Sequence, residues 1–588
     1  MENNATQTPS KSFIPFTKNI EHVIERMSIT EKTLFWIFTI AFIISGLNLL
    51  WKANQSFLVE IPMDGGTVSE GVIGMPLHVN PLLESTDTDR DLTALIYSGL
   101  YRPSPGGTLV PDLAESCTPS GNGLEYTCII KKDATFHDGE PVTADDIVFT
   151  VERAQDPIIK SVKRPNWEGV KVERINQSTV QFTLRQAYAP FMENLTMGIL
   201  PMHLWKDAAS EQFTLSQFNV EPIGSGPFRV NTIKRNKSGL PVYYSLTPFR
   251  QYVLGKPHID EFKMYFYANT ADLIKAFNSG EIESMSAISA EQAESLKKNG
   301  YNVLNASLPR VFGLFFNQNQ ATIFTNPEVK QAIEQAIDKQ SIIDKILFGF
   351  GAPANSPIPE ILRTSVIGTT TPTAPIATSS ASRIDLANKI LDDAKWKISS
   401  TTDTREKKSK KETQTLSFSI ATADSPELKG AAEIIKETLK QIHIDVKIEV
   451  FDPVSLNLNV IRPRKYDALL FGEVIGRDLD LFAFWHSSER NDPGYNIALY
   501  TNAKVDKYLT ETRATSSVAI RTDRFRKIET EISNDRPAIF LYSPDFLYIV
   551  PNHVAGVSIG LVTTPAERFD TVYRWYSKTE KVWKFLVN

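Results

Sequence analysis

The side chains that could carry out covalent or metal chemistry are few and widely spaced in this sequence. Of its eight histidines, the two nearest in sequence, His443 and His486, stand 43 residues apart. Metal ligands supplied by one helix or loop lie within a few residues of each other, as in the motif HExxH. The sequence therefore predicts no metal site of this kind.

Two short matches to catalytic motifs lack the surroundings that their chemistry needs. Gly556–Gly560 fits G-x-S-x-G, but a nucleophile elbow leads directly into a helix, whereas Leu561–Pro565 is rich in β-branched residues and ends in proline. Ser295 and Lys298 fit S-x-x-K without its companion motifs. We therefore predict no catalytic residue and no cofactor, and an enzyme acting on cell-wall peptides is the less favoured alternative.

The two cysteines of the chain are spaced for a disulfide across a hairpin. Cys117 and Cys128 flank Asn122-Gly123, the preferred pair for a two-residue hairpin turn. If that pair forms the turn, the cysteines face each other at a separation that suits a disulfide. We predict this disulfide, which requires an oxidising compartment; two reduced, buried cysteines are the alternative.

One uncharged segment is long enough to cross a membrane. Leu34–Trp51 contains 18 residues without a charge, which as a helix would extend roughly 27 Å, close to the hydrocarbon thickness of a bilayer. A buried core helix is rarely apolar on every face. A cleaved signal peptide usually has a shorter apolar region and a small-residue cleavage site, which Trp51–Gln55 does not provide. The segment predicts an uncleaved anchor.

Basic residues near this segment predict its orientation. Lys18, Arg26 and Lys32 precede it, whereas Lys52 is the only basic residue between it and Arg90. The positive-inside rule therefore places the N-terminus in the cytoplasm and the rest of the chain outside. The predicted location is the cell membrane, crossed once.

The overall composition excludes two classes of protein. The 63 basic and 68 acidic residues give a net charge of −5, whereas nucleic-acid binders usually have a basic excess. The hydrophobic fraction of 42% and the charged fraction of 22% are those of a folded protein. We therefore predict a folded chain of 588 residues without a nucleic-acid partner.

Local periodicity indicates a mixed α/β protein. Apolar residues alternate over 416–420, recur at helical spacing over 428–442, and alternate again over 444–450. A strand, helix and strand in this order form a βαβ unit with parallel strands. Residues 364–382 and 399–413 are polar and read as solvated loops, the second with an exposed basic tip.

Several stretches resemble the family 5 extracytoplasmic solute-binding proteins, the oligopeptide- and dipeptide-binding subunits of ABC importers. The resemblance begins near residue 65 and its stretches follow the family's order to the end of the chain. The most specific is YTCIIKKDATFHDGEPVTADDIVFTVER, residues 126–153. The others are NPLLESTDTDRDLTALIYSGL (80–100), LVPDLAES (109–116), GSGPF (224–228), residues 327–359, VDKYL (505–509) and residues 521–544.

The resemblance implies an α/β, two-lobed fold of the type II periplasmic-binding-protein class with an extra subdomain. The chain would cross between the lobes twice, and ligand would close the lobes about that hinge. The expected segments are a cytoplasmic tail (1–32), a transmembrane anchor (33–51), lobe I (57–105, 225–312 and 540–588), the extra subdomain (106–224) and lobe II (313–539).

The resemblance also implies a set of ligand-binding residues. Relatives hold the ligand's ammonium group with an acidic residue after a second-lobe strand, and Asp478 or, in a shifted register, Asp480 stands in that stretch. A surface-loop aspartate paired with Arg477 is the alternative for Asp478. Trp485 and Tyr500 match aromatic positions near the ligand, with core packing as the alternative for each. Tyr97 stands where relatives carry an aromatic or hydrophobic residue, but Ser98 replaces the acidic residue that usually follows it.

The function implied is capture of oligopeptides and their delivery to an ABC transporter permease and its ATPase. The expected partners are a peptide or other small solute, the transporter complex, and the membrane through one helix, with the receptor acting as a monomer. Two alternatives stay open: a binding protein for another solute, such as a nickel chelate or a sugar, and a ligand sensor or chaperone on the same scaffold.

Overall fold

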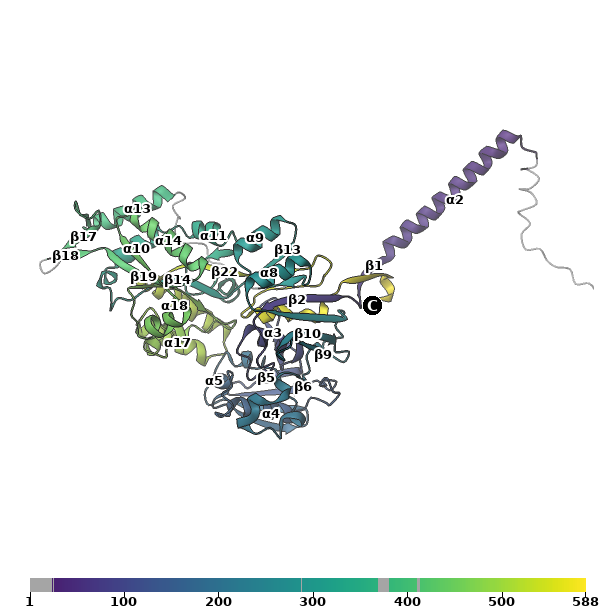
Figure 1. Ribbon diagram of the computed structural model, residues 1–588, viewed down its shortest axis with the longest axis horizontal. Coiled ribbons are helices and arrows are strands. Elements are labelled where there is room, and N and C mark those ends of the chain that lie inside the picture. Colours follow the sequence, from purple (N-terminus) through teal and green to yellow (C-terminus); the bar gives the residue numbers. More distant parts are fainter. Residues whose placement is uncertain (1–23, 25, 287, 369–379, 410–412, 588) are drawn as a thin grey trace, which may run out of the picture. The chain divides into compact units, whose positions relative to one another are not determined.

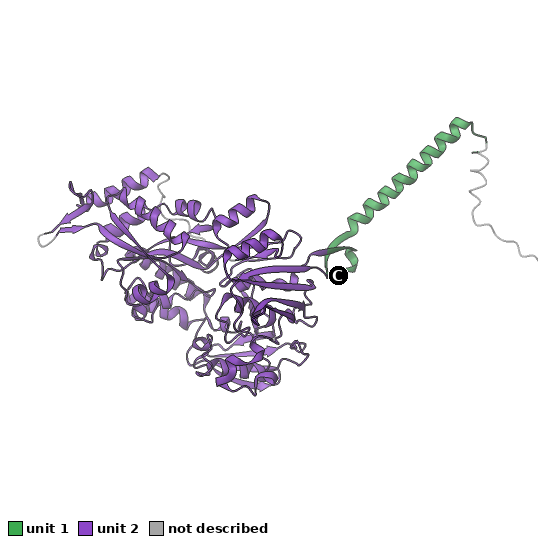
Figure 2. Cartoon of the chain, viewed as in Figure 1, with its two compact units in different colours: residues 1–63, 579–588 green, residues 64–578 purple. Residues whose placement is uncertain are grey.

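The computed structural model describes residues 24, 26–286, 288–368, 380–409 and 413–587 (Figure 1). The chain divides into two compact units, which Figure 2 distinguishes by colour. The first unit comprises residues 1–63 and 579–588, and the second comprises residues 64–578.

The first unit is built on one long helix, α2 (Ile29–Phe57), none of whose residues is buried. Among the described residues it is the one helix long and apolar enough to span a membrane. It begins before the predicted anchor because Ser28 and Glu31 form a capping box, and it continues past Trp51. The predicted tail, residues 1–32, lies mostly outside the described residues. The other elements of this unit are β1 (Leu58–Met63), β23 (Lys578–Trp583) and the short helix η8 (Lys584–Leu586).

The second unit contains a long mixed sheet whose two halves share one strand, β22 (Ala538–Val550). The C-terminal half of β22 pairs with β13, and its N-terminal half pairs with β14, so the sheet continues through this strand. The first half contains β2 (Thr67–Ile73), β9 (Phe228–Arg235), β10 (Pro241–Pro248), β11 (Glu261–Tyr267), β12 (Ser284–Met285) and β13 (Asn302–Ser307), with helices α3 (Asp87–Ile96), α8 (Thr270–Ser279) and α9 (Ala290–Lys298).

The second half of the sheet has helices on both faces. Its strands are β14 (Arg310–Phe316), β19 (Ser417–Ala423), β20 (Asp445–Phe451) and β21 (Ala468–Val474), with β15 (Gly351–Pro353) against β22. One apolar cluster involves α10 (Pro327–Ala336), α11 (Lys339–Ile346), α13 (Ser380–Asp393) and α14 (Pro426–Lys440). The other involves α12 (Glu360–Val366), α16 (Phe482–Trp485), α17 (Ala503–Ala514) and α18 (Val518–Asp535).

The predicted βαβ unit is present in this half. Strands β19 and β20 pair in parallel, and α14 connects them. Ser425 caps α14 by accepting a hydrogen bond from the Leu428 N–H, and Pro426 occupies the first helical turn. Five residues on one side of α14 are buried, which explains the helical spacing of its apolar residues: Leu428, Ala431, Ala432, Ile435 and Leu439.

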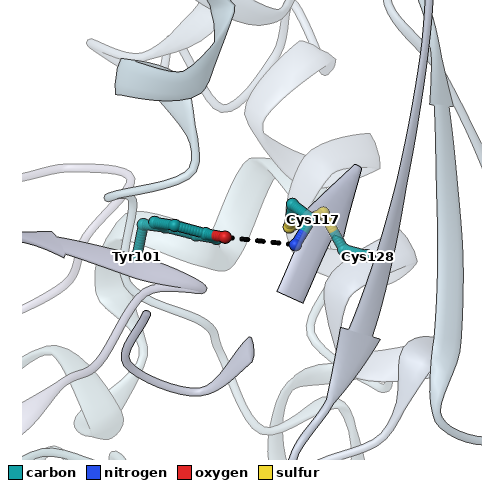
Figure 3. The surroundings of a disulfide bond; sticks show 3 residues. All are labelled: Tyr101, Cys117 and Cys128. Atoms are coloured by element: carbon teal, nitrogen blue, oxygen red, sulfur yellow. Dashed lines mark hydrogen bonds between the residues drawn. A yellow bond between two sulfur atoms is a disulfide. The ribbon is translucent and has the colours of Figure 1, made fainter. Parts of the chain in front are cut away.

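A separate four-stranded antiparallel sheet carries the disulfide (Figure 3). Cys117 on β5 stands opposite Cys128 on β6, and the two sulfurs are bonded, which confirms the prediction. The Cys117 N–H donates to the Tyr101 hydroxyl at 3.1 Å (Figure 3). The elements here are β5 (Ala114–Pro119), β6 (Glu125–Ile130), β7 (Lys171–Asn176), β8 (Thr179–Thr183), α4 (Ala144–Gln155), α5 (Arg164–Trp167), α6 (Phe191–Asn194) and α7 (Met202–Trp205).

The basic segment within 399–413 differs from the predicted exposed tip. Part of it forms a small sheet of β16 (Lys397–Ile398), β17 (Arg405–Lys408) and β18 (Thr413–Thr415). The Arg405 side chain is buried, donates to the carbonyls of Trp396 and Ile442, and pairs with Asp392. The prediction failed here because a basic run was taken as uniformly solvated, whereas this arginine links three segments. Residues 410–412 and 369–379 of the two predicted loops lie outside the described residues.

Candidate ligand-binding site

A polar cavity of about 290 Å³ lies where both halves of the long sheet and the disulfide-bearing region meet. Its walls come mainly from residues 81–112, 193–198 and 563–570 and from Arg477, which follows strand β21; Lys163, Pro227 and Tyr252 complete them. Both charge signs line it: the acidic residues are Glu84, Asp112, Glu193, Glu567 and Asp570, and the basic ones are Arg90, Arg102, Lys163 and Arg477. This is a concave, charged site of the kind that orients a small polar ligand.

Tyr97, one of the predicted ligand-binding residues, lines this cavity, and glycines pack against its backbone. The Gly226 N–H donates to the Ile96 carbonyl at 2.8 Å. A Cβ atom on Gly224 would lie 2.1 Å from the Ile96 oxygen, and one on Gly198 would lie 2.8 Å from the Tyr97 Cβ. The motif GSGPF therefore lets one loop pack directly against the backbone that carries Tyr97.

His137 fixes the same glycine loop from its other side. Its Nδ1 accepts from the Gly224 N–H at 3.3 Å, and its Nε2 lies 3.1 Å from the Gly226 carbonyl. These contacts require the neutral ring with the proton on Nε2. Burial lowers the pKa of His137 to about 4, which keeps the ring in that form. His137 thus supports the wall of the cavity without contacting it.

Arg477 connects the second half of the sheet to the other two walls of the cavity. Its Nη1 lies 3.3 Å from a carboxylate oxygen of Glu193 on α6, and its Nη2 lies 2.6 Å from one of Glu567. Only 5% of the Arg477 side chain is exposed. Charge-assisted bonds of this kind are stronger when water is excluded, so Arg477 holds the walls together in this arrangement.

Asp478 and Asp480, the two candidates for the ligand's ammonium group, differ in what their carboxylates already bind. Both oxygens of Asp480 accept from Arg513, at 2.6–3.0 Å. Asp478 accepts from Arg521 at 3.1 Å through Oδ1 alone. Its Oδ2 is buried and has no hydrogen-bond partner among the described residues. Of the two carboxylates, that of Asp478 therefore has an oxygen available for a ligand.

Asp478 does not line the cavity, but its charge acts on Glu193, which does. Burial raises the pKa of Asp478, and the Arg521 guanidinium partly offsets this effect. Burial, followed by the negative charges of Asp478 and Glu567, raises the pKa of Glu193 to about 7, although Arg477 opposes the rise. A cation entering here would therefore meet acidic groups whose negative charge the nearby guanidinium groups balance only in part.

Further buried polar atoms at the cavity wall have no hydrogen-bond partner within the described part of the chain, among them the Tyr97 hydroxyl, the Thr93 hydroxyl and Nε of Arg477. A buried polar group without a partner costs free energy, and native structures rarely leave several together. A bound ligand would supply the missing partners. The atoms include an N–H donor, two hydroxyls and, next to the cavity, the Asp478 acceptor.

Trp485 and Tyr500 do not line the cavity. Trp485 is fully buried and packs against the rings of Phe315, Phe540 and Tyr500. The Tyr500 hydroxyl donates to Asp535 at 2.5 Å. In this arrangement both side chains contribute to the apolar cluster beneath the second half of the sheet. Both aromatic rings therefore pack in the core, which was the alternative to ligand contact in the sequence analysis.

Sequence reasoning missed Arg477, Glu193 and Glu567. Arg477 could have been proposed as a cavity residue, because it directly precedes Asp478 in the stretch that carries the resemblance. Glu193 and Glu567 lie on short helices and are 284 and 90 residues away from Arg477. Helices of four or five residues leave no clear periodic signal. Only the fold brings these three side chains together.

The described residues contain no group of three His, Cys, Asp or Glu side chains placed to hold a metal ion. The part of the cavity wall that the structure describes also lacks histidine. The side chains present suit hydrogen bonding and ion pairing with an organic solute.

Known proteins match this chain in sequence and in fold. Residues 108–496 match the middle region of the bacterial extracellular solute-binding proteins, family 5. The oligopeptide-binding protein AppA of Bacillus subtilis is 27% identical over 513 residues, which are 84% of this chain and 89% of AppA.

Two solved structures align with most of this chain. The ABC transporter substrate-binding protein CtaP of Listeria monocytogenes has 25% identity and a TM-score of 0.72, with 88% of this chain and 100% of CtaP covered. NikZ of Campylobacter jejuni, solved with Ni(L-His), has 26% identity and a TM-score of 0.67, with 88% and 100% covered. The two-lobed α/β fold predicted from the sequence is confirmed by these matches.

The family match spans well over half of the chain, and its relatives serve transport rather than catalysis. This chain belongs to the family 5 bacterial extracellular solute-binding proteins and is not an enzyme.

Proposed function

We propose that this protein is a membrane-anchored receptor that captures oligopeptides between its two lobes and delivers them to an ABC import permease. The observation that carries the proposal is the buried Oδ2 of Asp478, which has no partner among the described residues, in a side chain whose charge acts on Glu193 in the cavity wall. A ligand ammonium group there would make a charge-assisted hydrogen bond. The similarity to an oligopeptide-binding protein supports the same ligand class.

The charges around the cavity favour a zwitterionic ligand over the two alternatives. Acidic and basic side chains both line it, so an ammonium and a carboxylate would each meet a complementary group. A nickel chelate would favour an imidazole, and the described wall contains none. NikZ was solved with Ni(L-His), so a chelate is the alternative ligand that the test below includes.

The hinge of the proposed closure lies at β14 and β22, where the two halves of the long sheet join. Lobe I would comprise residues 57–105, 225–312 and 540–588, and lobe II residues 313–539, with 106–224 as the extra subdomain. The pairing of β22 with β13 on one side and with β14 on the other supports these limits. Ligand would shift the population of lobe arrangements by contacting both lobes.

The anchor in this proposal is α2, with the N-terminus in the cytoplasm. Exposed tryptophans stand near both ends of its uncharged segment, Trp36 and Trp51, as in helices that span a bilayer. Anchoring would keep the receptor beside its permease and raise the effective concentration without new contacts.

The ligand class can be tested by thermal unfolding of the full chain in detergent micelles. A pool of tri- to pentapeptides should raise the melting temperature, because a ligand that binds the folded state stabilises it. A sugar pool and Ni(L-His) serve as matched additions and should leave it unchanged. A rise with either of these and none with peptides would contradict the peptide assignment.

A further inference from the structure

The C-terminal segment of the chain lies against the end of helix α2. Strand β23 pairs with β1, the strand that directly follows α2. Lys581 lies 3.7 Å from Glu60, and the Trp583 indole N–H donates to Asn54 at 2.8 Å. The two strands therefore run in opposite directions, and the end of the chain is held at the last turn of α2.

This segment is apolar and exposed. Trp583, Phe585, Leu586 and Val587 are each exposed by 46–68%. The rings of Trp583 and Phe585 lie 5.4 Å apart and form one surface. Scattered exposed apolar side chains are ordinary in a folded protein, but a contiguous group at a chain end marks a contact surface.

The hydrogen bond to Asn54 sets the level of this surface along α2. Asn54 follows the last residue of the uncharged segment, Trp51, by three positions, or roughly 4.5 Å along a helix. The headgroup layer on each side of a bilayer is about 5–8 Å thick. If α2 spans the membrane, Trp583 therefore lies at the level of the headgroups, where tryptophan is enriched.

The charged residues of this region suit the same environment. Lys581 precedes the apolar side chains and Lys584 lies among them; both are exposed, as is Lys52 near the end of α2. Long basic side chains beside apolar ones can extend toward lipid phosphates while their stems stay in the apolar layer. The combination of aromatic, aliphatic and lysine side chains is typical of segments that lie in a membrane interface.

We propose that residues 583–587 form a second membrane contact, inserted at the headgroup boundary of the outer leaflet beside α2. The occupant of this surface is the lipid bilayer, because the surface continues the apolar face that α2 presents to the same bilayer. The inference rests on the proposed anchoring by α2. In addition to that anchor, residues 583–587 would hold the pair of β1 and β23 at the membrane surface.

Lipid contact can be measured with a fluorophore on an introduced cysteine in the full chain. Cys117 and Cys128 are already joined, so the new thiol alone would react. Phe585→Cys and Leu586→Cys are exposed positions that should tolerate the label. Glu580→Cys, exposed on β23, is the matched control. The labelled chains are reconstituted in phosphatidylcholine–phosphatidylglycerol vesicles with or without lipids brominated near the headgroup.

We expect the brominated lipids to quench labels at 585 and 586 several-fold more than the label at 580, and aqueous iodide to show the reverse order. Equal quenching at all three positions would overturn the inference, as would preferential iodide quenching at 585 and 586. Alkaline carbonate extraction tests α2 separately. A chain that stays in the membrane with an aqueous label at 585 contradicts only the second contact, whereas release of the whole chain removes the anchor as well.

Discussion

Two buried ionic clusters, one in the core and one at the cavity, differ in whether all of their buried polar atoms have hydrogen-bond partners. In the core cluster, Arg568 is fully buried and binds both Glu70 and Asp91 at 2.6–2.8 Å. Glu70 also accepts from the hydroxyls of Tyr548 and Ser284. In the cavity cluster, formed by Arg477, Glu193, Glu567 and Asp478, two buried atoms lack partners among the described residues.

The difference indicates which cluster serves the fold and which serves a ligand. A buried network with every group satisfied makes one arrangement more stable than its alternatives. The core cluster joins β2, α3, β22 and the segment after β22, and it leaves Arg568 no free donor. The cavity cluster keeps Nε of Arg477 and Oδ2 of Asp478 available. Under the proposed function, an incoming ligand would complete this network at those two atoms.

Breaking the core cluster should have the largest effect on stability. Arg568→Met leaves Glu70 and Asp91 buried without a cation, which we expect to lower the free energy of unfolding by about 3–5 kcal/mol. Chemical denaturation measures the change. Arg574→Met, at an exposed position nearby, should cost less than about 1 kcal/mol. Equal losses in the two variants would contradict the role of the core cluster.

Breaking the cavity cluster should change lobe closure more than stability. Arg477→Gln removes the ion pairs to Glu193 and Glu567, so the ligand-free closed form should lose about 1–2 kcal/mol relative to the open form. Small-angle scattering should then report a larger radius of gyration without ligand. Arg363→Gln, which breaks a pair with Glu529 inside the second lobe, is the control. An unchanged radius of gyration in Arg477→Gln would contradict the proposal that Arg477 holds the cavity walls together.

A smaller effect should appear on changing pH. The pKa of Glu193 is raised from its ordinary 4.5 to about 7 in this arrangement, which corresponds to the closed form in the proposed function. The closed form therefore binds a proton that the open form releases between these values. Closure should strengthen as pH falls from about 7 toward 5 and weaken as pH rises through 7, because the raised pKa makes ionised Glu193 costly when buried.

Scattering between pH 5 and 8 on the ligand-free chain measures this dependence, and Glu193→Gln should flatten it because the neutral amide cannot titrate. Asp478 and Glu567, which act on Glu193, stay in place in that variant, as does Arg477. If the pH dependence is unchanged in Glu193→Gln, a group other than Glu193 must be the one that titrates.

The sequence predicted the features that depend on local order. The cysteine spacing around Asn122-Gly123 fixed the hairpin register, and the alternation over 416–420 and 444–450 gave two parallel strands. The resemblance supplied the two-lobed fold, whereas the role of Asp478 stays a prediction. The ion pairs of Arg477 with Glu193 and Glu567 were not predictable, because these acidic partners lie on short helices far away in the chain. The buried Arg405 shows that a run of basic residues does not reveal which of them is covered.

In the proposed function, Asp478 receives the ammonium group of a bound peptide. Titration calorimetry should compare free-amine and N-acetylated forms of one tripeptide on the parent chain, on Asp478→Asn and on Asp480→Asn. Asp480 is the matched control, because both of its oxygens are occupied by Arg513. We predict that Asp478→Asn weakens the free-amine peptide by about 10- to 100-fold and the acetylated one far less, with little selectivity in Asp480→Asn. Equal losses for both peptides in Asp478→Asn, or selective loss only in Asp480→Asn, would contradict the account.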